Sequence, residues 1–166
     1  MFSERVVNVG NVIIGGNHPI VIQSMTNTDT KNFEGTLRQI NDLADAGAKI
    51  VRVSVRDMED ISSFSKIVTY SKVPVVADIH FDYRLAIEAI KAGAAKIRIN
   101  PVNIGSEEKI KKIVEVAKEY KVPIRIGSNS GSIGKEFRNL PRYQALAESV
   151  LKDVRLLEKE GFYDIV

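Results

Sequence analysis

Three arginines occupy matching positions in short apolar segments of this chain, and their placement suits recognition of a phosphorylated anion. They are Arg52, Arg98 and Arg125, in the segments IVRVSV, KIRINP and PIRIGSN. A parallel strand buried on both faces normally reads as an unbroken apolar run. Cations directed into a common interior are costly unless an anion meets them there. We expect the three guanidinium groups to hold a phosphate or diphosphate. The plainer alternative is a structural salt bridge to an interior carboxylate.

A carboxylate and an imidazole follow the same alternation in a fourth segment, VVADIH. Asp78 and His80 are two positions apart, so both side chains face one side of a strand. Either group can act as a general acid or base, or can orient substrate hydroxyls, and we predict a catalytic role for both. The alternative is an aspartate paired with an arginine and a histidine that caps the next helix. His18, before Pro19, is predicted to be an ordinary loop residue.

Loops rich in asparagine, serine and glycine follow the strand-like segments. Asn100 and Asn129 come shortly after two of the arginines, and we expect both to contribute to binding the diphosphate. Such loops present backbone N–H groups to phosphates, although turns use the same residue types for purely conformational reasons. A similar loop after the first strand places Thr26, Asn27 and Thr28 where they could reach a ligand.

These segments belong to a regular alternation of strands and amphipathic helices. A β-hairpin is predicted around Gly10-Asn11, and the last residues, 164–166, read as the start of one more strand. Ser106 is predicted to cap a helix and Pro141 to begin one. The strands are expected at 20–25, 50–55, 75–80, 96–100 and 123–129, and the helices at 33–47, 58–71, 82–93, 106–120 and 141–161.

About five βα units in series indicate a parallel α/β architecture. We predict a (β/α)8 barrel of the TIM type that stops at its sixth strand, with residues 1–166 forming the N-terminal part of the barrel domain. The rival is an open, doubly wound sheet, which this length would complete. The hairpin, which can plug a barrel floor, and the inward polar residues of successive strands both favour the barrel.

Composition narrows the class of protein. The chain is 44% hydrophobic with 7% aromatic residues, carries a net charge of +3 and has no cysteine. No apolar run approaches the ~20 residues that cross a bilayer, and no secretion signal is recognisable. The mild, dispersed charge and scattered aromatics argue against nucleic-acid binding. We expect a cytoplasmic protein without disulfides and without a cluster or metal bound by its own residues.

Several motifs in order resemble one enzyme family. QSMTNTDT, LADAGAKIVRVSV, VADIHFDYRLA, KIRINPVNIG and IRIGSNSGS are similar to 4-hydroxy-3-methylbut-2-enyl diphosphate synthase, the iron–sulfur oxidoreductase of the non-mevalonate isoprenoid pathway. The resemblance implies a TIM barrel followed by a C-terminal [4Fe-4S] domain, which we expect to lie outside this chain. It implies reductive ring opening of 2-C-methyl-D-erythritol 2,4-cyclodiphosphate, with electrons from ferredoxin or flavodoxin, in a homodimer.

The resemblance also assigns roles to residues. It implies that the diphosphate is gripped by arginines and asparagines, while Asp78 and His80 face the erythritol hydroxyls or relay a proton. Two departures stand out: Arg56 where the family usually has proline, and Val102 where it usually has glycine. Because no cysteine is present, we expect this chain alone to lack turnover. The diphosphate ligands implied are Arg52, Arg98, Asn100, Arg125 and Asn129.

Two other functions stay open on the sequence. A pteroate-synthase-like barrel would use similar strand-end residues on a pterin diphosphate. A non-catalytic half-barrel would act by pairing with another copy or another chain.

Overall fold

The computed structural model describes residues 4–128, 133–137 and 139–166. Its centre is a five-stranded parallel sheet in the order β3-β4-β5-β6-β7. Ile165 forms a parallel bridge to Ile124, so the last residues extend the sheet beyond β7, as predicted for 164–166. The strands are β3 (Gln23–Met25), β4 (Ile50–Val55), β5 (Val75–Ile79), β6 (Lys96–Ile99) and β7 (Ile124–Ile126).

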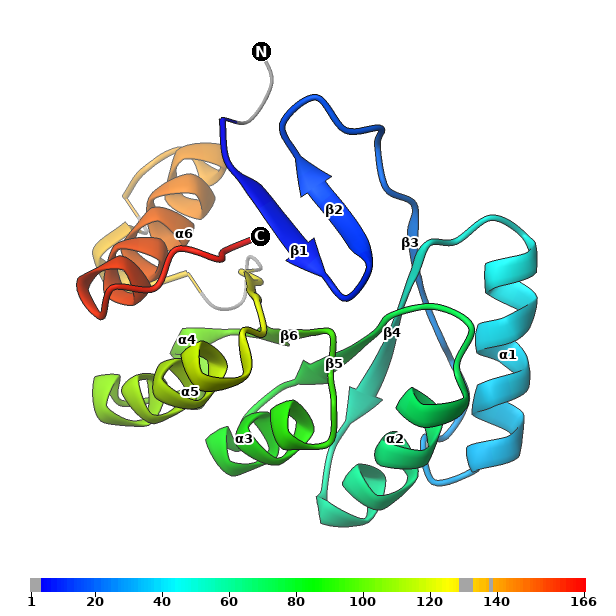
Figure 1. The fold of residues 1–166 in the computed structure, drawn as a ribbon. Coiled ribbons are helices and arrows are strands. Elements are labelled where there is room, and N and C mark those ends of the chain that lie inside the picture. Colours follow the sequence, from blue (N-terminus) through cyan, green and yellow to red (C-terminus); the bar gives the residue numbers. More distant parts are fainter. Residues whose placement is uncertain (1–3, 129–132, 138) are drawn as a thin grey trace.

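A helix connects each strand to the next, and strand order follows chain order, which is the arrangement of a barrel wall. Figure 1 shows α1, α2, α3 and α5 side by side on one face of the sheet, with α6 beyond them near the C-terminus. The helices are α1 (Phe33–Asp45), α2 (Met58–Tyr70), α3 (Tyr83–Lys91), α4 (Pro101–Ile104), α5 (Glu107–Tyr120) and α6 (Arg142–Lys159), with a 3-10 turn, η1 (Lys135–Phe137).

Local sequence signals explain where the helices begin and end. The Asp57 carboxylate accepts hydrogen bonds from the backbone N–H groups of Glu59 and Asp60 and so caps α2. Gly47 follows α1 with a φ of 108°, a conformation that residues with a Cβ rarely adopt. Ser106 precedes α5 as predicted, but its hydroxyl makes no capping hydrogen bond.

The main hydrophobic core lies between the sheet and its helices. It is built from the strand residues that alternate away from the arginines, such as Val53 and Ile79, packed against helix residues such as Phe64 and Ile113. The charged residues of the same strands therefore lie on the opposite face, because successive strand side chains alternate.

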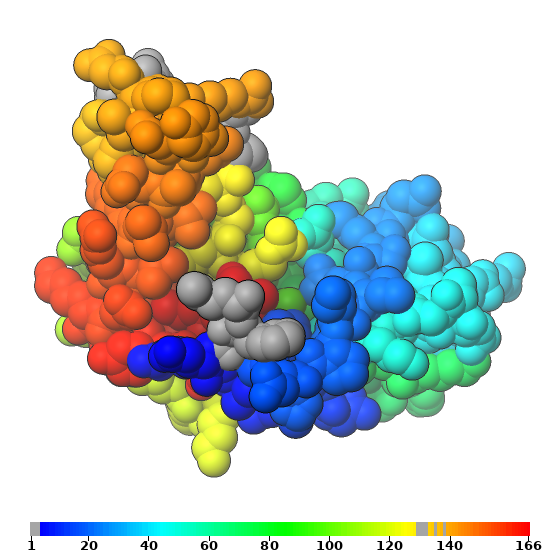
Figure 2. Space-filling view, turned by 90° about the horizontal axis from the view of Figure 1, so that it is seen from above, coloured from blue at the N-terminus to red at the C-terminus, as the bar shows by residue number. Residues whose placement is uncertain are grey.

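The N-terminal hairpin covers one end of that opposite face. Strands β1 (Val6–Val9) and β2 (Val12–Gly15) pair antiparallel around Gly10, whose φ is 59°. Val9 is fully buried and packs with Ile50 and Val76 in a second, small core. The hairpin thus plugs the N-terminal end of the strands, as predicted, and we call this end the floor. In Figure 2 the hairpin, in blue, lies beside the red C-terminal residues.

Most predicted elements are confirmed, with three differences. The first extended run, expected over 20–25, is a strand only at Gln23–Met25. Of the strand expected over 123–129, the described residues form a strand only at Ile124–Ile126. The short helix α4 lies within residues 100–108, which were expected to be a loop. In the part of the chain that the structure describes, no helix is both long and apolar enough to cross a membrane.

Candidate anion-binding site

We call the face of the sheet that lies opposite the helix-covered core the inner face. The strand register aligns charged residues in a row across it. Ser54 lies opposite Asp78, Asp78 opposite Arg98, and Arg98 opposite Arg125. Arg52 is two residues earlier in β4, one layer closer to the floor. The structure therefore brings the three predicted arginines and the predicted aspartate together on four adjacent strands, as the alternation indicated.

Asp78 is the centre of this cluster. It is 4% exposed, and its two carboxylate oxygens lie 3.4 Å from Arg52 Nε and 3.2 Å from Arg98 Nη1. His80 Nε2 lies 3.7 Å from the same carboxylate, and the imidazole is 45% exposed. The salt-bridge interpretation of two arginines is thus correct as geometry, but one carboxylate cannot neutralise three guanidinium groups.

Arg125 carries the uncompensated charge. Among the described residues it forms no hydrogen bond or ion pair, although its side chain is half-buried. Burial, followed by repulsion from Arg52 and Arg98, lowers the pKa of Arg125, and Asp78 only partly opposes this shift. A cation under such pressure is stabilised by an incoming anion.

Gly127 allows one of these guanidinium groups to approach the backbone closely. A Cβ built on Gly127 would come within 2.6 Å of Arg98 Nη2 and 2.8 Å of Cζ, inside van der Waals contact. The Gly127 N–H meanwhile donates to the Ile99 carbonyl at 2.9 Å. The glycine therefore leaves the space that the Arg98 side chain occupies, a role that the sequence did not reveal.

Asn100 offers a hydrogen-bond donor at the upper end of β6. Its side-chain oxygen accepts from the Val102 N–H at 3.2 Å, which caps α4. Its Nδ2 is buried and has no partner within the described part of the chain. An unpaired buried donor of this kind is unusual and suits a ligand oxygen. Asn129, the other predicted asparagine, lies outside the described residues.

Lys96 is a fourth inward cation, which we missed in the sequence. It lies two residues before Arg98 and opposite Val76, so it belongs to the layer just above the floor. The side chain is 1% exposed, and its Nζ donates to Gln23 Oε1 at 2.9 Å. The same alternation that selected Arg98 could have selected Lys96, because a lysine at this spacing also breaks an apolar run.

The loop after β3 is held by protein contacts. The Thr28 hydroxyl shares a 2.8 Å hydrogen bond with Thr36, and Asn27 bonds to Gln39, so both are engaged with α1. The hypothesis that this loop reaches a ligand finds no support in these two side chains.

Arg56, at the position where the family resemblance implies proline, also holds the loop after β3 in place. It bonds twice to the buried Asp60 carboxylate, with Nε 2.9 Å from Oδ2, and also pairs with Asp29. This bridge joins the loops that follow β3 and β4.

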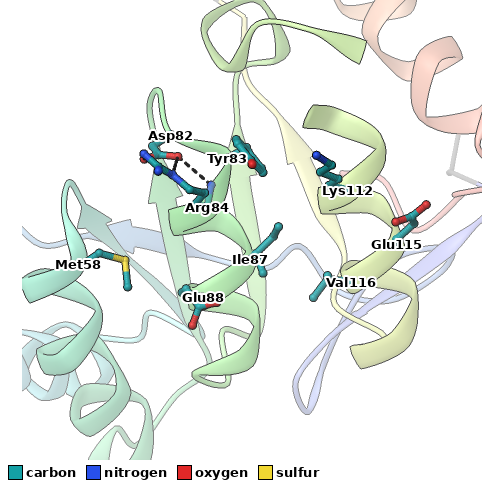
Figure 3. A pocket seen from close by; sticks show the side chains of 9 residues that line it. All are labelled: Met58, Asp82, Tyr83, Arg84, Ile87, Glu88, Lys112, Glu115 and Val116. Atoms are coloured by element: carbon teal, nitrogen blue, oxygen red, sulfur yellow. Dashed lines mark hydrogen bonds and ion pairs between the residues drawn. The ribbon is translucent and has the colours of Figure 1, made fainter. Parts of the chain in front are cut away.

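A separate groove of about 680 Å³ lies on the outer surface (Figure 3). Its walls come from α2, α3 and α5, on the far side of the sheet from the arginines. Arg84 and Lys112 line it together with Glu88 and Glu115, and Arg84 is paired with Asp82 at 2.7 Å. With Asp82 the lining has three carboxylates and two cations, so the groove does not favour an anion and the inner face is the better candidate.

The described residues contain no group of three or more histidine, aspartate or glutamate side chains placed to hold a metal ion. The sequence has no cysteine, so this chain offers no thiolate to an iron–sulfur cluster. The inner face has the chemistry of an anion site: several guanidinium groups, a buried lysine and an open amide donor.

Solved structures of other proteins share the fold of this chain. By structure, the chain resembles a dihydropteroate synthase from Yersinia pestis (TM-score 0.72, 12% identity, 98% of this chain and 62% of that one). It also resembles phospho-2-dehydro-3-deoxyheptonate aldolase from Thermotoga maritima (TM-score 0.69, 15% identity, 99% of this chain and 45% of that one). At such identities the likeness concerns the fold alone, and it confirms an α/β structure of the TIM-barrel type.

The sequence comparisons go further. The family model described as the GcpE TIM-barrel domain matches residues 4–166, and the chain belongs to this family. It is 56% identical to 4-hydroxy-3-methylbut-2-en-1-yl diphosphate synthase (flavodoxin) of Caldanaerobacter subterraneus subsp. tengcongensis, over 98% of this chain and 46% of that protein. The same enzyme of Natranaerobius thermophilus is 53% identical over 96% of this chain and 46% of that protein. The chain thus spans about half the length of these curated relatives, and the predicted family is confirmed.

Proposed function

We propose that this chain is the substrate-binding barrel portion of a 4-hydroxy-3-methylbut-2-enyl diphosphate synthase, and that its inner face binds 2-C-methyl-D-erythritol 2,4-cyclodiphosphate. The observation that carries the proposal is the cluster of Arg52, Arg98 and Arg125 around a single carboxylate. The curated relatives that bear this enzyme name support the identity of the ligand.

The arginines and the two asparagines divide the work of binding. Arg125 is unpaired within the described residues, and Arg98 and Arg52 can each keep Asp78 while turning remaining N–H groups to phosphate oxygens. The free Nδ2 of Asn100 donates to the same anion, and Asn129 is proposed to assist.

Asp78 and His80 are proposed to act on the erythritol body. Asp78 is held by two guanidinium groups and is suited to accept a hydrogen bond from a hydroxyl. His80 is more exposed and lies beside that carboxylate, where an imidazole can donate or accept a proton. The proposed reaction is a two-electron reduction in which the ring opens and the C3 oxygen leaves as water.

The redox centre lies outside this chain in our proposal. The residues present do not fit a [4Fe-4S] cluster, so no step is assigned to one here. Flavodoxin, which the relatives' printed name includes, or ferredoxin is proposed as electron donor, a homodimer as the assembly and the cytoplasm as the location. The chain by itself is expected to bind the cyclic diphosphate without turning it over.

The pteroate-synthase alternative is not retained. The likeness to dihydropteroate synthases is at 12–15% identity, whereas the named synthase relatives share 51–56%. A half-barrel that acts only by assembly would not explain why several cations cluster on the inner face.

Calorimetric titration of the 166-residue chain with the cyclic diphosphate tests the proposal. We expect saturable binding, and Arg98→Ala is expected to weaken it by at least tenfold, because a charge-assisted hydrogen bond contributes about 1.5–3 kcal/mol. Arg38→Ala removes an exposed arginine on α1 and serves as the control of equal charge. Equal affinity in wild type and Arg98→Ala, or no binding by the wild type, contradicts the proposal.

A further inference from the structure

The floor of the site holds a lysine in unusual surroundings. Lys96 is 1% exposed, and its ammonium group has one hydrogen-bond partner, the neutral side chain of Gln23. Within the described ranges no carboxylate forms an ion pair with it. A buried ammonium without a counter-ion is costly, and the cost falls if the group releases its proton.

The charged groups around Lys96 increase this cost. Arg125 of β7 and Arg52 of β4 both repel it, and burial has the largest effect, so the pKa of Lys96 falls to about 8. Asp78, one layer above on β5, is already engaged by Arg52 and Arg98. Among the described residues, His80 lies beside Asp78 above this region, and His18 lines the cavity below it.

Lys96 nevertheless has a route to solvent protons. With Gln23, Ile50, His18 and Arg125 it lines a cavity of about 480 Å³ between the strands and the hairpin. A proton can therefore reach the amine from the floor while a ligand occupies the arginines from above.

We propose that Lys96 is a positioning residue that takes up a proton when a diphosphate binds to the arginines, so that ligand binding and lysine protonation are coupled. This inference rests on the proposed function. The negative charge of the ligand offsets the repulsion from Arg52 and Arg125, which favours the ammonium form. The charged lysine in turn adds to the positive potential around the arginines, which strengthens their attraction for the anion.

The coupling has a definite dependence on pH. In a cyclic diphosphate each phosphorus bears one strongly acidic oxygen, so the ligand itself does not titrate near neutrality. Starting from a pKa of about 8, binding takes up almost no proton at pH 6.5, about half a proton at pH 8 and nearly one at pH 9. The affinity is therefore expected to fall by about tenfold between pH 7 and pH 9.

Calorimetry in buffers of different ionisation enthalpy measures this uptake directly. Lys96→Met keeps an unbranched side chain without a charge and should abolish both the uptake and the tenfold pH dependence. Lys96→Arg keeps a permanent cation and should bind independently of pH. Lys66→Met, at an exposed position of α2, should behave as wild type.

Carbon-13 NMR of the lysine Cε atoms separates failure of this inference from failure of the proposed function. The resonance absent from Lys96→Met reports Lys96 itself and excludes the two histidines as the source. We expect it to titrate near pH 8 without ligand and above pH 10 with the cyclic diphosphate. Binding without proton uptake, or titration of Lys96 near pH 10.5 in the free chain, overturns the inference alone. Absence of any binding overturns the proposed function and this inference with it.

Discussion

Asp78 is the residue on which the electrostatics of the inner face depend. It is almost fully buried and contacts Arg52 and Arg98, while Arg125 and Lys96 add positive charge nearby. Replacing one partner of a buried ion pair commonly costs 3–5 kcal/mol, because the remaining charge is left uncompensated. The carboxylate therefore stabilises the empty site by partly neutralising the guanidinium groups. An incoming anion neutralises them further.

Asp78→Asn is expected to lower the free energy of unfolding by about 3 kcal/mol, since three guanidinium groups then face one another without a carboxylate. Pyrophosphate should restore part of the loss, and should raise the urea midpoint more in the variant than in wild type. Asp42→Asn, at an exposed position of α1, is the control. A variant as stable as wild type would contradict the central role of Asp78.

Gly127→Ala is expected to weaken binding of the cyclic diphosphate by about tenfold, at the scale of one lost charge-assisted hydrogen bond. The new Cβ would overlap the Arg98 guanidinium, which must move away from its present position. Calorimetry should show this loss, and Gly47→Ala, at a glycine whose added Cβ meets nothing within 4 Å, is the control for backbone strain. Unchanged affinity in Gly127→Ala would show that the position of Arg98 is not fixed by this contact.

At the scale of elements, strands were predicted well because their physics is local. The strand at 50–55 was predicted with its observed bounds, and period-2 alternation placed Arg52, Asp78 and Arg98 on one face. The contacts that the sequence did not indicate depend on the tertiary structure. Thr28 satisfies its hydroxyl on α1, and the close approach of Gly127 to Arg98 joins two strands. Lys96 follows the same alternation as Arg98 and could have been predicted from it.

Helix α6 carries a buried acid that the sequence pattern did not indicate. Its inner stripe consists of Ala145, Ser149, Asp153 and Leu157, spaced four residues apart. Asp153 is 6% exposed, and within the described residues its Oδ2 has no hydrogen-bond partner. Burial raises the pKa of Asp153 to about 6, against a small opposing effect of Lys152.

This raised pKa makes the stability fall as pH rises from about 4 to 6, because the folded chain binds more protons than the unfolded chain in that window. Asp153→Asn removes this titration. The unfolding free energy of the variant minus that of wild type should therefore be about 2 kcal/mol larger at pH 7.5 than at pH 4.5. Urea denaturation at the two pH values measures the difference. The same gain at both values would contradict an unpaired, buried carboxyl.

At the scale of the whole molecule, the parallel sheet has an open edge. Among the described residues β3 pairs only with β4, and the segment that leads into it exposes two apolar side chains, Ile20 at 97% and Ile22 at 61%. Exposed edges with apolar side chains are templates for pairing with other chains.

We therefore expect the 166-residue chain to self-associate at micromolar concentrations, with a mass above that of one chain by light scattering. The double substitution Ile20→Lys and Ile22→Lys should shift it towards the monomer, because edge lysines oppose strand pairing. Met58→Lys, at an exposed apolar position on α2, should leave association unchanged. Equal masses for all three proteins would exclude this edge as the contact.

The hairpin that closes the floor also governs the order in which the chain can fold. Val9 is buried against Ile50 and Val76, and Arg5 lies 4.8 Å from the centre of the Tyr163 ring. The hairpin can therefore dock only after segments much further along the chain have come into place. Such long-range closure slows folding, so we expect the floor of the sheet to close late in folding.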